Sequence, residues 1–135
     1  MSFTLRVLAP DQSVFDGSAD EVILPSTTGQ LGVLTGHVSM LTALDSGVLR
    51  VREGNSWKAI ALSGGFAEVD ADEVTVLVNA AELGSNIDTA TAEKAFEAAQ
   101  QLFNGFEGKP SSPEKIKAEK SLANARARLS ASRAG

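Results

Sequence analysis

The chain has 135 residues, 43% of them apolar and 21% charged, which is typical of a globular protein with one ordinary core, or one small core plus an appendage. It has no cysteine and no stretch near the roughly 20 apolar residues of a membrane-spanning helix, so disulfides, thiolate chemistry and membrane spans are excluded and a cytosol-like compartment fits. The net charge of −5 argues against a general nucleic-acid-binding protein.

The first predicted strand covers residues 3–8, where Phe3, Leu5 and Val7 alternate with polar side chains. Six more strand patterns follow, separated by short turns rich in glycine, aspartate and asparagine, at residues 21–24, 31–34, 48–52, 57–62, 66–69 and 73–78. Such short, closely spaced strands favour a sandwich or a barrel. We expect a β sandwich of about ten short strands over residues 1–86.

The pair Gly64-Gly65 interrupts the strand pattern before Phe66. Glycines inside a strand predict a β-bulge, or a corner where the chain passes between sheets. A ligand-binding loop is the alternative, but a structural role is the commoner one for such a pair.

The hydrophobic period changes from 2 to 3.6 near Ile87, behind an N-cap residue at Asp88 or Thr89. The apolar residues that follow at helical spacing are Ala92, Ala95, Phe96, Ala99, Leu102, Phe103 and Phe106. Asn104-Gly105 ends this helix. Ser112-Pro113 begins a second helix, with serine as the N-cap and proline at the first position.

Residues 87–135 are therefore expected to form a helical hairpin, which we call the arm. Its second helix has a thin apolar stripe of Ala118, Leu122, Ala125 and Leu129. Alanine buries little area, so the contacts of the arm should be weak and the arm could detach at modest cost. Residues 113–135 contain six basic and two acidic residues, a net charge of +4, which leaves −9 for residues 1–112.

Few residues could support catalysis. His37 is the only histidine, which excludes a multi-histidine metal site; a Ser-His-Asp arrangement is formally possible, but no Gly-x-Ser-x-Gly motif is present. Residues 29–32 lack the glycines and the following helix of a phosphate-binding loop and predict a turn entering a strand. Asp70, Asp72 and Glu73 surround a hairpin turn, where acidic residues are usually solvated; calcium binding is the alternative, without EF-hand spacing.

Six segments carry a resemblance to a known family. They are Ile23–Leu34, Gly36-His37, Leu41–Leu44, Ala61–Val69, Val74–Leu77 and Asn86-Ile87-Asp88. In order and over essentially the whole chain, they resemble the epsilon subunit of bacterial and chloroplast F-type ATP synthases, and are most similar to the cyanobacterial branch.

The resemblance implies an N-terminal β sandwich and a C-terminal helix pair, in agreement with the periodicity. It implies a non-catalytic rotor subunit of the central stalk without cofactors, whose sandwich docks on the gamma subunit and the ring of c subunits and helps to couple proton flow to ATP synthesis. Such a subunit is a peripheral membrane protein on the cytoplasmic, or stromal-equivalent, face of a thylakoid or plasma membrane, and reaches the membrane only through its partners.

In the family, the segment at residues 29–41 faces the polar loops of the c ring. The resemblance therefore nominates as contact residues Gln30, Gly32, Val33, His37, Ser39 and Met40. Family members often have proline at the position of Ser39 and glutamate at that of Gln30, so the charge of this contact differs here. For His37 there are two alternatives, a role at the loop surface without a specific partner and a specific interfacial hydrogen bond.

The arm of family members can extend along gamma and inhibit ATP hydrolysis at the catalytic alpha and beta subunits, near an acidic segment. Here Lys120, Arg126 and Arg128 are the candidates for that role. Arg126 and Arg128 point about 200° apart on a helix, so both cannot pair with one carboxylate cluster, and we expect one to face the partner and the other water. The alternative is a solvated basic helix end that complements the helix dipole.

Some family members bind ATP through an Ile-Asp-x-x-Arg-Ala pattern at the start of the first helix, together with arginines of the second. Ile87, Asp88, Ala92 and Arg128 match this site, but Thr91 stands where the arginine should be. Threonine lacks the charged, multi-donor group that phosphates favour. We expect no physiologically useful ATP site, although weak binding stays open.

Two other functions compete with the rotor subunit. A free-standing β-sandwich binding module with a helical tail, for carbohydrate, would need a concave patch of exposed aromatics, yet the chain has no tyrosine and one tryptophan. A small hydrolase would depend on His37. The sequence does not decide whether the arm rests folded or extended.

Overall fold

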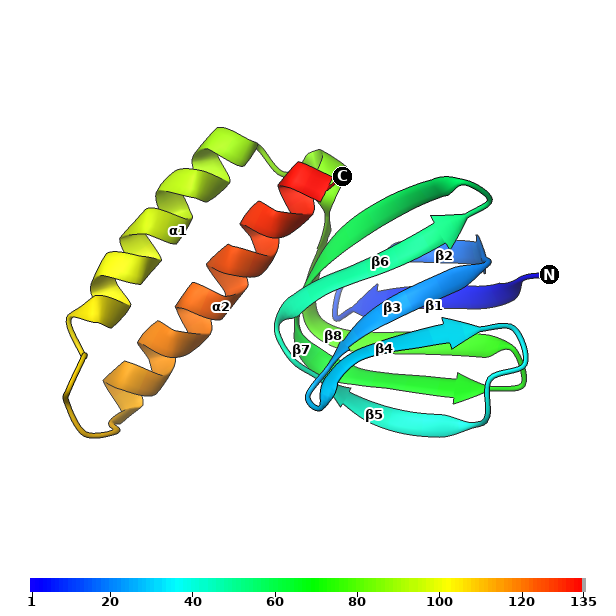
Figure 1. Cartoon of the computed structure of the whole chain (residues 1–135), viewed down its shortest axis with the longest axis horizontal. Coiled ribbons are helices and arrows are strands. Elements are labelled where there is room, and N and C mark those ends of the chain that lie inside the picture. The colour runs from blue at the N-terminus through cyan, green and yellow to red at the C-terminus, as the bar shows by residue number, and fades with distance from the viewer. Residues whose placement is uncertain (135) are drawn as a thin grey trace.

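The computed structural model describes residues 1–134 and places a β domain before two helices (Figure 1). The strands are β1 (Phe3–Ala9), β2 (Gln12–Ala19), β3 (Glu21–Ser26), β4 (Gly29–Leu34), β5 (Met40–Leu44), β6 (Gly47–Glu53), β7 (Ser56–Asp70) and β8 (Glu73–Leu83). A 3-10 turn, η1 (Gly84–Asn86), leads to α1 (Thr89–Asn104) and α2 (Pro113–Ala134). The predicted sandwich followed by a helical hairpin is confirmed.

The eight strands form one hydrogen-bonded sheet that folds over into two layers, in the order β2-β1-β8-β7-β5-β3-β4, with β6 pairing to β3 and β7. The β1–β8 pair is parallel and the other pairs are antiparallel. The first half of β7 pairs with β6 and its second half with β5. β7 therefore belongs to both layers.

Gly64-Gly65 marks the point where β7 changes partner. Ser63 pairs with Ala80 and Gly65 with Val78, so the register to β8 continues without a bulge and the pair forms a corner. A Cβ atom on Gly65 would collide with the carbonyl oxygen of Leu77. The close approach of two backbones therefore requires glycine here.

The strand count corrects the expectation of about ten strands. Segments 57–62 and 66–69 are one continuous strand, because the glycine pair bends β7 without ending it. The sequence pattern also missed β2 and β5. Strand β2 is an edge strand whose sequence does not alternate between apolar and polar residues, and β5 has only five residues, with the apolar Leu41 exposed and the polar Thr42 half-buried.

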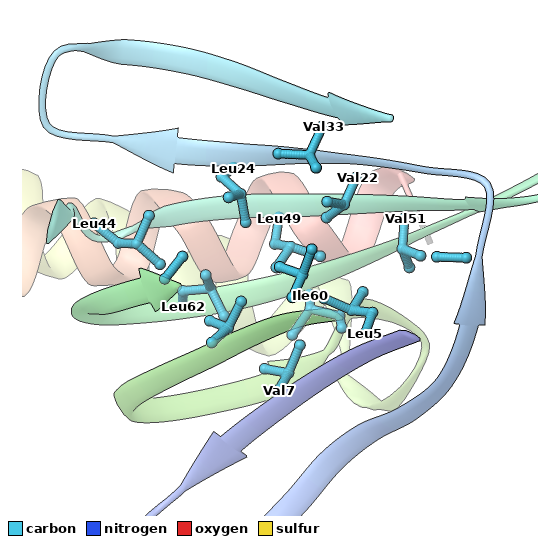
Figure 2. Packing of buried hydrophobic residues seen from close by; sticks show 14 of the residues in the cluster. Leu5, Val7, Val22, Leu24, Val33, Leu44, Leu49, Val51, Ile60 and Leu62 are labelled. Atoms are coloured by element: carbon cyan, nitrogen blue, oxygen red, sulfur yellow. The ribbon is translucent and has the colours of Figure 1, made fainter. Parts of the chain in front are cut away.

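The core lies between the two layers of the sandwich, where inward-facing aliphatic side chains meet (Figure 2). Its most deeply buried large members are Leu5, Val7, Val22, Leu24, Val33, Leu49, Val51, Ile60, Leu62, Val69, Val74 and Val76. Strands β1, β3 and β8 each bury alternate residues, which is the half-buried pattern of a two-layer sandwich.

The helices begin and end where the sequence predicts. The Asp88 carboxylate caps α1 by accepting a hydrogen bond from the Thr91 backbone N–H at 3.1 Å, and α1 ends at Asn104. The Ser112 hydroxyl accepts one from the Lys115 N–H at 3.1 Å, ahead of Pro113. Neither α1 nor α2 is long and apolar enough to cross a membrane.

Helix α2 packs on α1 and on the β domain, and the second contact was not predicted. Of the expected stripe, Ala118, Leu122 and Leu129 are buried and Ala125 is half-buried. A further face of α2 lies against the sandwich, in a small cluster of Ala59, Ala61, Ile87, Ala92, Ala127, Leu129 and Ala131. The arm is thus held by two alanine-rich faces, one of which rests on β7.

Gly84 should be essential for the docking of α2. The Cβ atom of a Gly84→Ala variant would collide with the Ala131 carbonyl oxygen, and α2 would have to shift. We expect a loss of about 1–3 kcal/mol in the free energy of unfolding, the usual cost of overpacking, with faster amide exchange in α2. Chemical denaturation and hydrogen exchange measure both.

Gly32→Ala is the matched control, because a Cβ atom there meets nothing within 4 Å. Its free energy of unfolding should change by less than about 0.5 kcal/mol. Equal stability of the two variants, with unchanged α2 exchange, would contradict the docking contact described above.

Candidate interaction surfaces

The β4–β5 loop, residues 35–39, lies at the end of the sandwich that points away from the helices (Figure 1). Two aspartates of the β7–β8 turn hold it. Asp72 Oδ1 accepts a hydrogen bond from the Gly36 N–H at 2.8 Å, and Asp70 Oδ1 accepts one from the Ser39 hydroxyl at 2.9 Å. Val38, at the middle of the loop, is 74% exposed.

His37 is a half-buried residue of this loop, and its Nδ1 donates to the Val38 carbonyl oxygen at 2.8 Å. This bond ties the ring to its own loop. Within residues 1–134 no group of three acidic or histidine side chains is placed to hold a metal ion. Asp70 and Asp72, for which calcium binding was the alternative, are engaged with the loop.

The structure separates the residues nominated for the c-ring contact. Ser39 and the half-buried Met40 lie near His37, whereas Gln30 lies at the opposite end of β4, where it lines a cavity of about 280 Å³ together with Arg126 of α2. Gly32 is exposed midway along β4.

Val33 is corrected as a contact residue. Its side chain is 1% exposed and points into the core between the layers (Figure 2). Val33 pairs with the fully buried Val22 of β3, and directly opposite residues share one face of a sheet.

The outer face of the β5-β7-β8-β1 layer carries an exposed apolar patch that sequence reasoning missed. We call it the outer patch, and it consists of Leu8, Leu41, Ala43, Phe66 and Leu77. Phe66 pairs with Ala43 on one side and Leu77 on the other, and Leu77 pairs with Leu8. Leu41, Phe66 and Leu77 are 70%, 56% and 54% exposed. A signal existed, because Phe66 and Leu77 are apolar at positions where the alternation calls for polar residues.

The three arginines of α2 contact acidic or aromatic side chains within the chain. Arg128 Nε lies 2.9 Å from Glu82 Oε2 of β8, and its Nη2 lies 3.4 Å from Oε1. This hydrogen bond raises the pKa of Arg128 above its ordinary value. Arg133 pairs with Glu93 of α1 at 2.6 Å.

Arg126 and Arg128 lie on different sides of α2, as the helical geometry predicts. Arg126 is exposed, with its guanidinium 5.9 Å from the centre of the Phe96 ring on α1. The expectation that one of the pair faces water is only partly met, because Arg126 also contacts this ring. Lys120 is exposed on α2, beside a cavity that also borders Asp45 and Asn124.

The residues that match the ATP-binding pattern are engaged in contacts within the chain itself. Ile87 and Ala92 are 7% and 1% exposed in the cluster beneath the arm. The Thr91 hydroxyl and N–H both donate to the Asp88 carboxylate and hold the pKa of Asp88 below its ordinary value. The fourth residue, Arg128, is paired with Glu82.

Comparisons with known proteins cover both parts of the chain. Residues 2–84 match the family described as ATP synthase, Delta/Epsilon chain, beta-sandwich domain, and residues 85–133 match its long alpha-helix domain. The ATP synthase epsilon chain of Synechococcus sp. (strain CC9605) is 71% identical over 133 residues, which cover 98% of each chain. That of Prochlorococcus marinus (strain MIT 9303) is 62% identical, covering 98% of this chain and 100% of the relative.

Two solved structures have the same fold. A chain of the Euglena gracilis mitochondrial ATP synthase, determined with OSCP, F1 and c-ring, matches with a TM-score of 0.79 and 25% identity over 97% of this chain and 81% of that chain. A chain of the Tetrahymena thermophila mitochondrial ATP synthase central stalk and c-ring has a TM-score of 0.61 over 95% and 94% of the two chains; at 18% identity it supports the fold alone.

The matches to both family domains and the high identity to cyanobacterial epsilon chains confirm the resemblance found in the sequence. The chain therefore belongs to the delta/epsilon chain family of ATP synthase, as a non-catalytic epsilon-type subunit.

Proposed function

We propose that this chain is a rotor subunit in the central stalk of a proton-translocating F-type ATP synthase, where its sandwich helps to transmit rotation and its arm restrains ATP hydrolysis. The observation that carries the proposal is the match of both domains, in order, to epsilon chains over 98% of the sequence. The chain forms no bonds in the reaction itself.

The outer patch is the surface that we assign to the gamma subunit. It is apolar, crosses four strands and includes Leu41, Phe66 and Leu77, each more than half exposed. Contiguous exposed apolar side chains typically mark a protein interface, because leaving them in water costs free energy. A rotor subunit needs a firm contact with the shaft that it turns with.

The β4–β5 loop is the surface that we assign to the c ring. It lies at the end of the sandwich away from the arm, and the segment between Leu34 and Leu44 has no Asp, Glu, Lys or Arg. The loop itself therefore offers an uncharged contact, and Gln30, where relatives often have glutamate, lies at the opposite end of β4. Through this ring the subunit sits at the membrane as a peripheral protein, on the cytoplasmic or stromal-equivalent face of a plasma or thylakoid membrane.

The arm is the regulatory part. In its folded position Arg128 and Arg133 are paired with Glu82 and Glu93, so two of the six basic residues of α2 are neutralised within the chain. An arm that extends loses these pairs, and its residues 113–135 present a net charge of +4 to the acidic segment of the alpha and beta subunits. The side chains of the two pairs are about 40% to 59% exposed, and such ion pairs contribute at most about 1 kcal/mol each.

A free-standing binding module is the second function in view, but no observation favours it. The two exposed aromatic residues of β7, Trp57 and Phe66, lie on opposite sides of the corner at Gly64-Gly65 and do not form one aromatic surface. The hydrolase hypothesis gains nothing either, since His37 Nδ1 is bound to the Val38 carbonyl oxygen.

The gamma contact is tested by Phe66→Glu. A charge in the centre of the outer patch should reduce the recovery of gamma in a pull-down from native membranes by at least about tenfold, the scale of an interface hot spot. Thermal stability should stay the same, because Phe66 is 56% exposed. Leu102→Glu on α1, at a residue 59% exposed, is the matched control and should recover gamma normally.

Failure of the unaltered chain to recover gamma would contradict the proposed rotor function. Equal recovery of gamma by the Phe66→Glu and Leu102→Glu variants would instead contradict only the assignment of the outer patch to gamma.

The restraint of hydrolysis is tested by deleting residues 88–135 and measuring membrane ATPase activity. We expect the rate to rise. In the full chain, Arg126→Glu should raise it about twofold to fivefold, the factor for one exposed ion pair. Lys94→Glu, an equal charge change on α1, should leave it nearly unchanged. An unchanged rate in the deletion variant would exclude the restraint and leave the rotor function standing.

ATP binding is tested by isothermal titration. Because Thr91 replaces arginine and Arg128 is paired with Glu82, we expect no heat that fits a micromolar dissociation constant. The Thr91→Arg variant restores the family pattern and should bind measurably tighter than the unaltered chain. Micromolar binding by the unaltered chain would overturn the expectation that the arm responds to something other than ATP.

A further inference from the structure

The β7–β8 turn, residues 70–72, holds the β4–β5 loop near both of its ends. The Asp72 carboxylate accepts from the Gly36 N–H at 2.8 Å, and the Asp70 carboxylate accepts from the Ser39 hydroxyl at 2.9 Å. The contact joins segments more than 30 residues apart in the sequence. A hydrogen bond to a charged acceptor is stronger than a neutral one, so this turn is well suited to fix the shape of the loop.

The residues of this turn are unusual for its backbone conformation. Ala71 and Asp72 have φ angles of 49° and 62°, the left-handed conformation that tight hairpin turns need. Glycine adopts this conformation with the least strain, and asparagine followed by glycine is the commonest pair there. The turn shape alone would thus favour glycine at position 72, where the chain has a carboxylate that bonds to the loop.

The turn is itself anchored to the sandwich. The Asp72 carbonyl oxygen accepts from the Thr4 N–H of β1 at 3.0 Å, and Asp70 pairs with Glu73 at the end of the β7–β8 ladder. The two carboxylates therefore extend from backbone that three strands hold in place. The loop that they bind carries Val38, 74% exposed, and leads into Leu41, 70% exposed.

We propose that Asp70 and Asp72 are positioning residues for the c-ring contact. They hold residues 35–39 in the shape in which Val38 and its neighbours meet the ring. The inference rests on the proposed function for the partner, but the hold on the loop is a property of this chain alone.

The test uses the full-length chain with Asp72→Gly. This change removes the carboxylate and relieves the left-handed backbone, so the melting temperature should stay equal or rise. The amides of residues 36–39 should nevertheless exchange about fivefold faster, the factor for the loss of one hydrogen bond. About fivefold more subunit should be needed to restore ATP-driven proton pumping to membranes depleted of it.

Two further variants separate positioning from a structural role. Asp72→Asn keeps an oxygen that can accept from Gly36 and should restore both slow loop exchange and pumping at normal subunit concentration. Asp11→Gly removes a charge from an exposed turn at the other end of the sandwich and should leave the loop and the pumping as they are.

Unchanged loop exchange in Asp72→Gly would overturn the hold on the loop. Faster loop exchange with unchanged pumping would overturn the positioning role. If the unaltered chain itself fails to restore pumping, the proposed function fails together with the positioning role, and the exchange rates still decide whether the aspartates hold the loop.

Discussion

Gly65 lets two backbones approach more closely than any side chain would permit, and the rest of the fold is arranged around that contact. A Cβ atom there would collide with the Leu77 carbonyl oxygen. The approach allows β7 to turn a corner while it keeps its register with β8, so one strand serves both layers of the sandwich. β8 follows the same bend, because its first half pairs with β1 and its second half with the first half of β7.

Each functional surface depends on one part of β7. Its first half presents Ala59 and Ala61 to α2, and its second half presents Phe66 at the centre of the outer patch. It ends at Asp70, which holds the loop assigned to the c ring. The surfaces that we assign to gamma and to the c ring, and the seat of the arm, therefore all adjoin a single continuous strand.

The arm is held by contacts of a different kind from those of the core. The core buries leucine, isoleucine and valine, whereas α2 rests on the sandwich mainly through alanines and one partly exposed ion pair, Arg128–Glu82. A second exposed pair, Arg133–Glu93, joins α2 to α1. Burial of an alanine contributes much less than burial of a leucine, and exposed ion pairs contribute little. The arm is thus held more weakly than the core of the sandwich, as the regulatory role that we propose for it requires.

Much of this was determined by the sequence itself. Alternation over residues 3–8 and 73–78, the cap residues Asp88 and Ser112, and the change of period near Ile87 depend on neighbours in the chain, and the structure bears them out. The segments that resemble epsilon subunits also identified the family. Local spacing carries such information because strands, helices and caps form from short-range backbone geometry.

Only the tertiary structure decided which surfaces are available. It placed Val33 in the core, separated Gln30 from His37, gathered Leu8, Leu41, Phe66 and Leu77 on one face, and paired Arg128 with Glu82. It also brought Asp70 and Asp72 to the loop. These contacts join residues far apart in the chain, and their partners follow from strand order and helix docking, which no local pattern specifies.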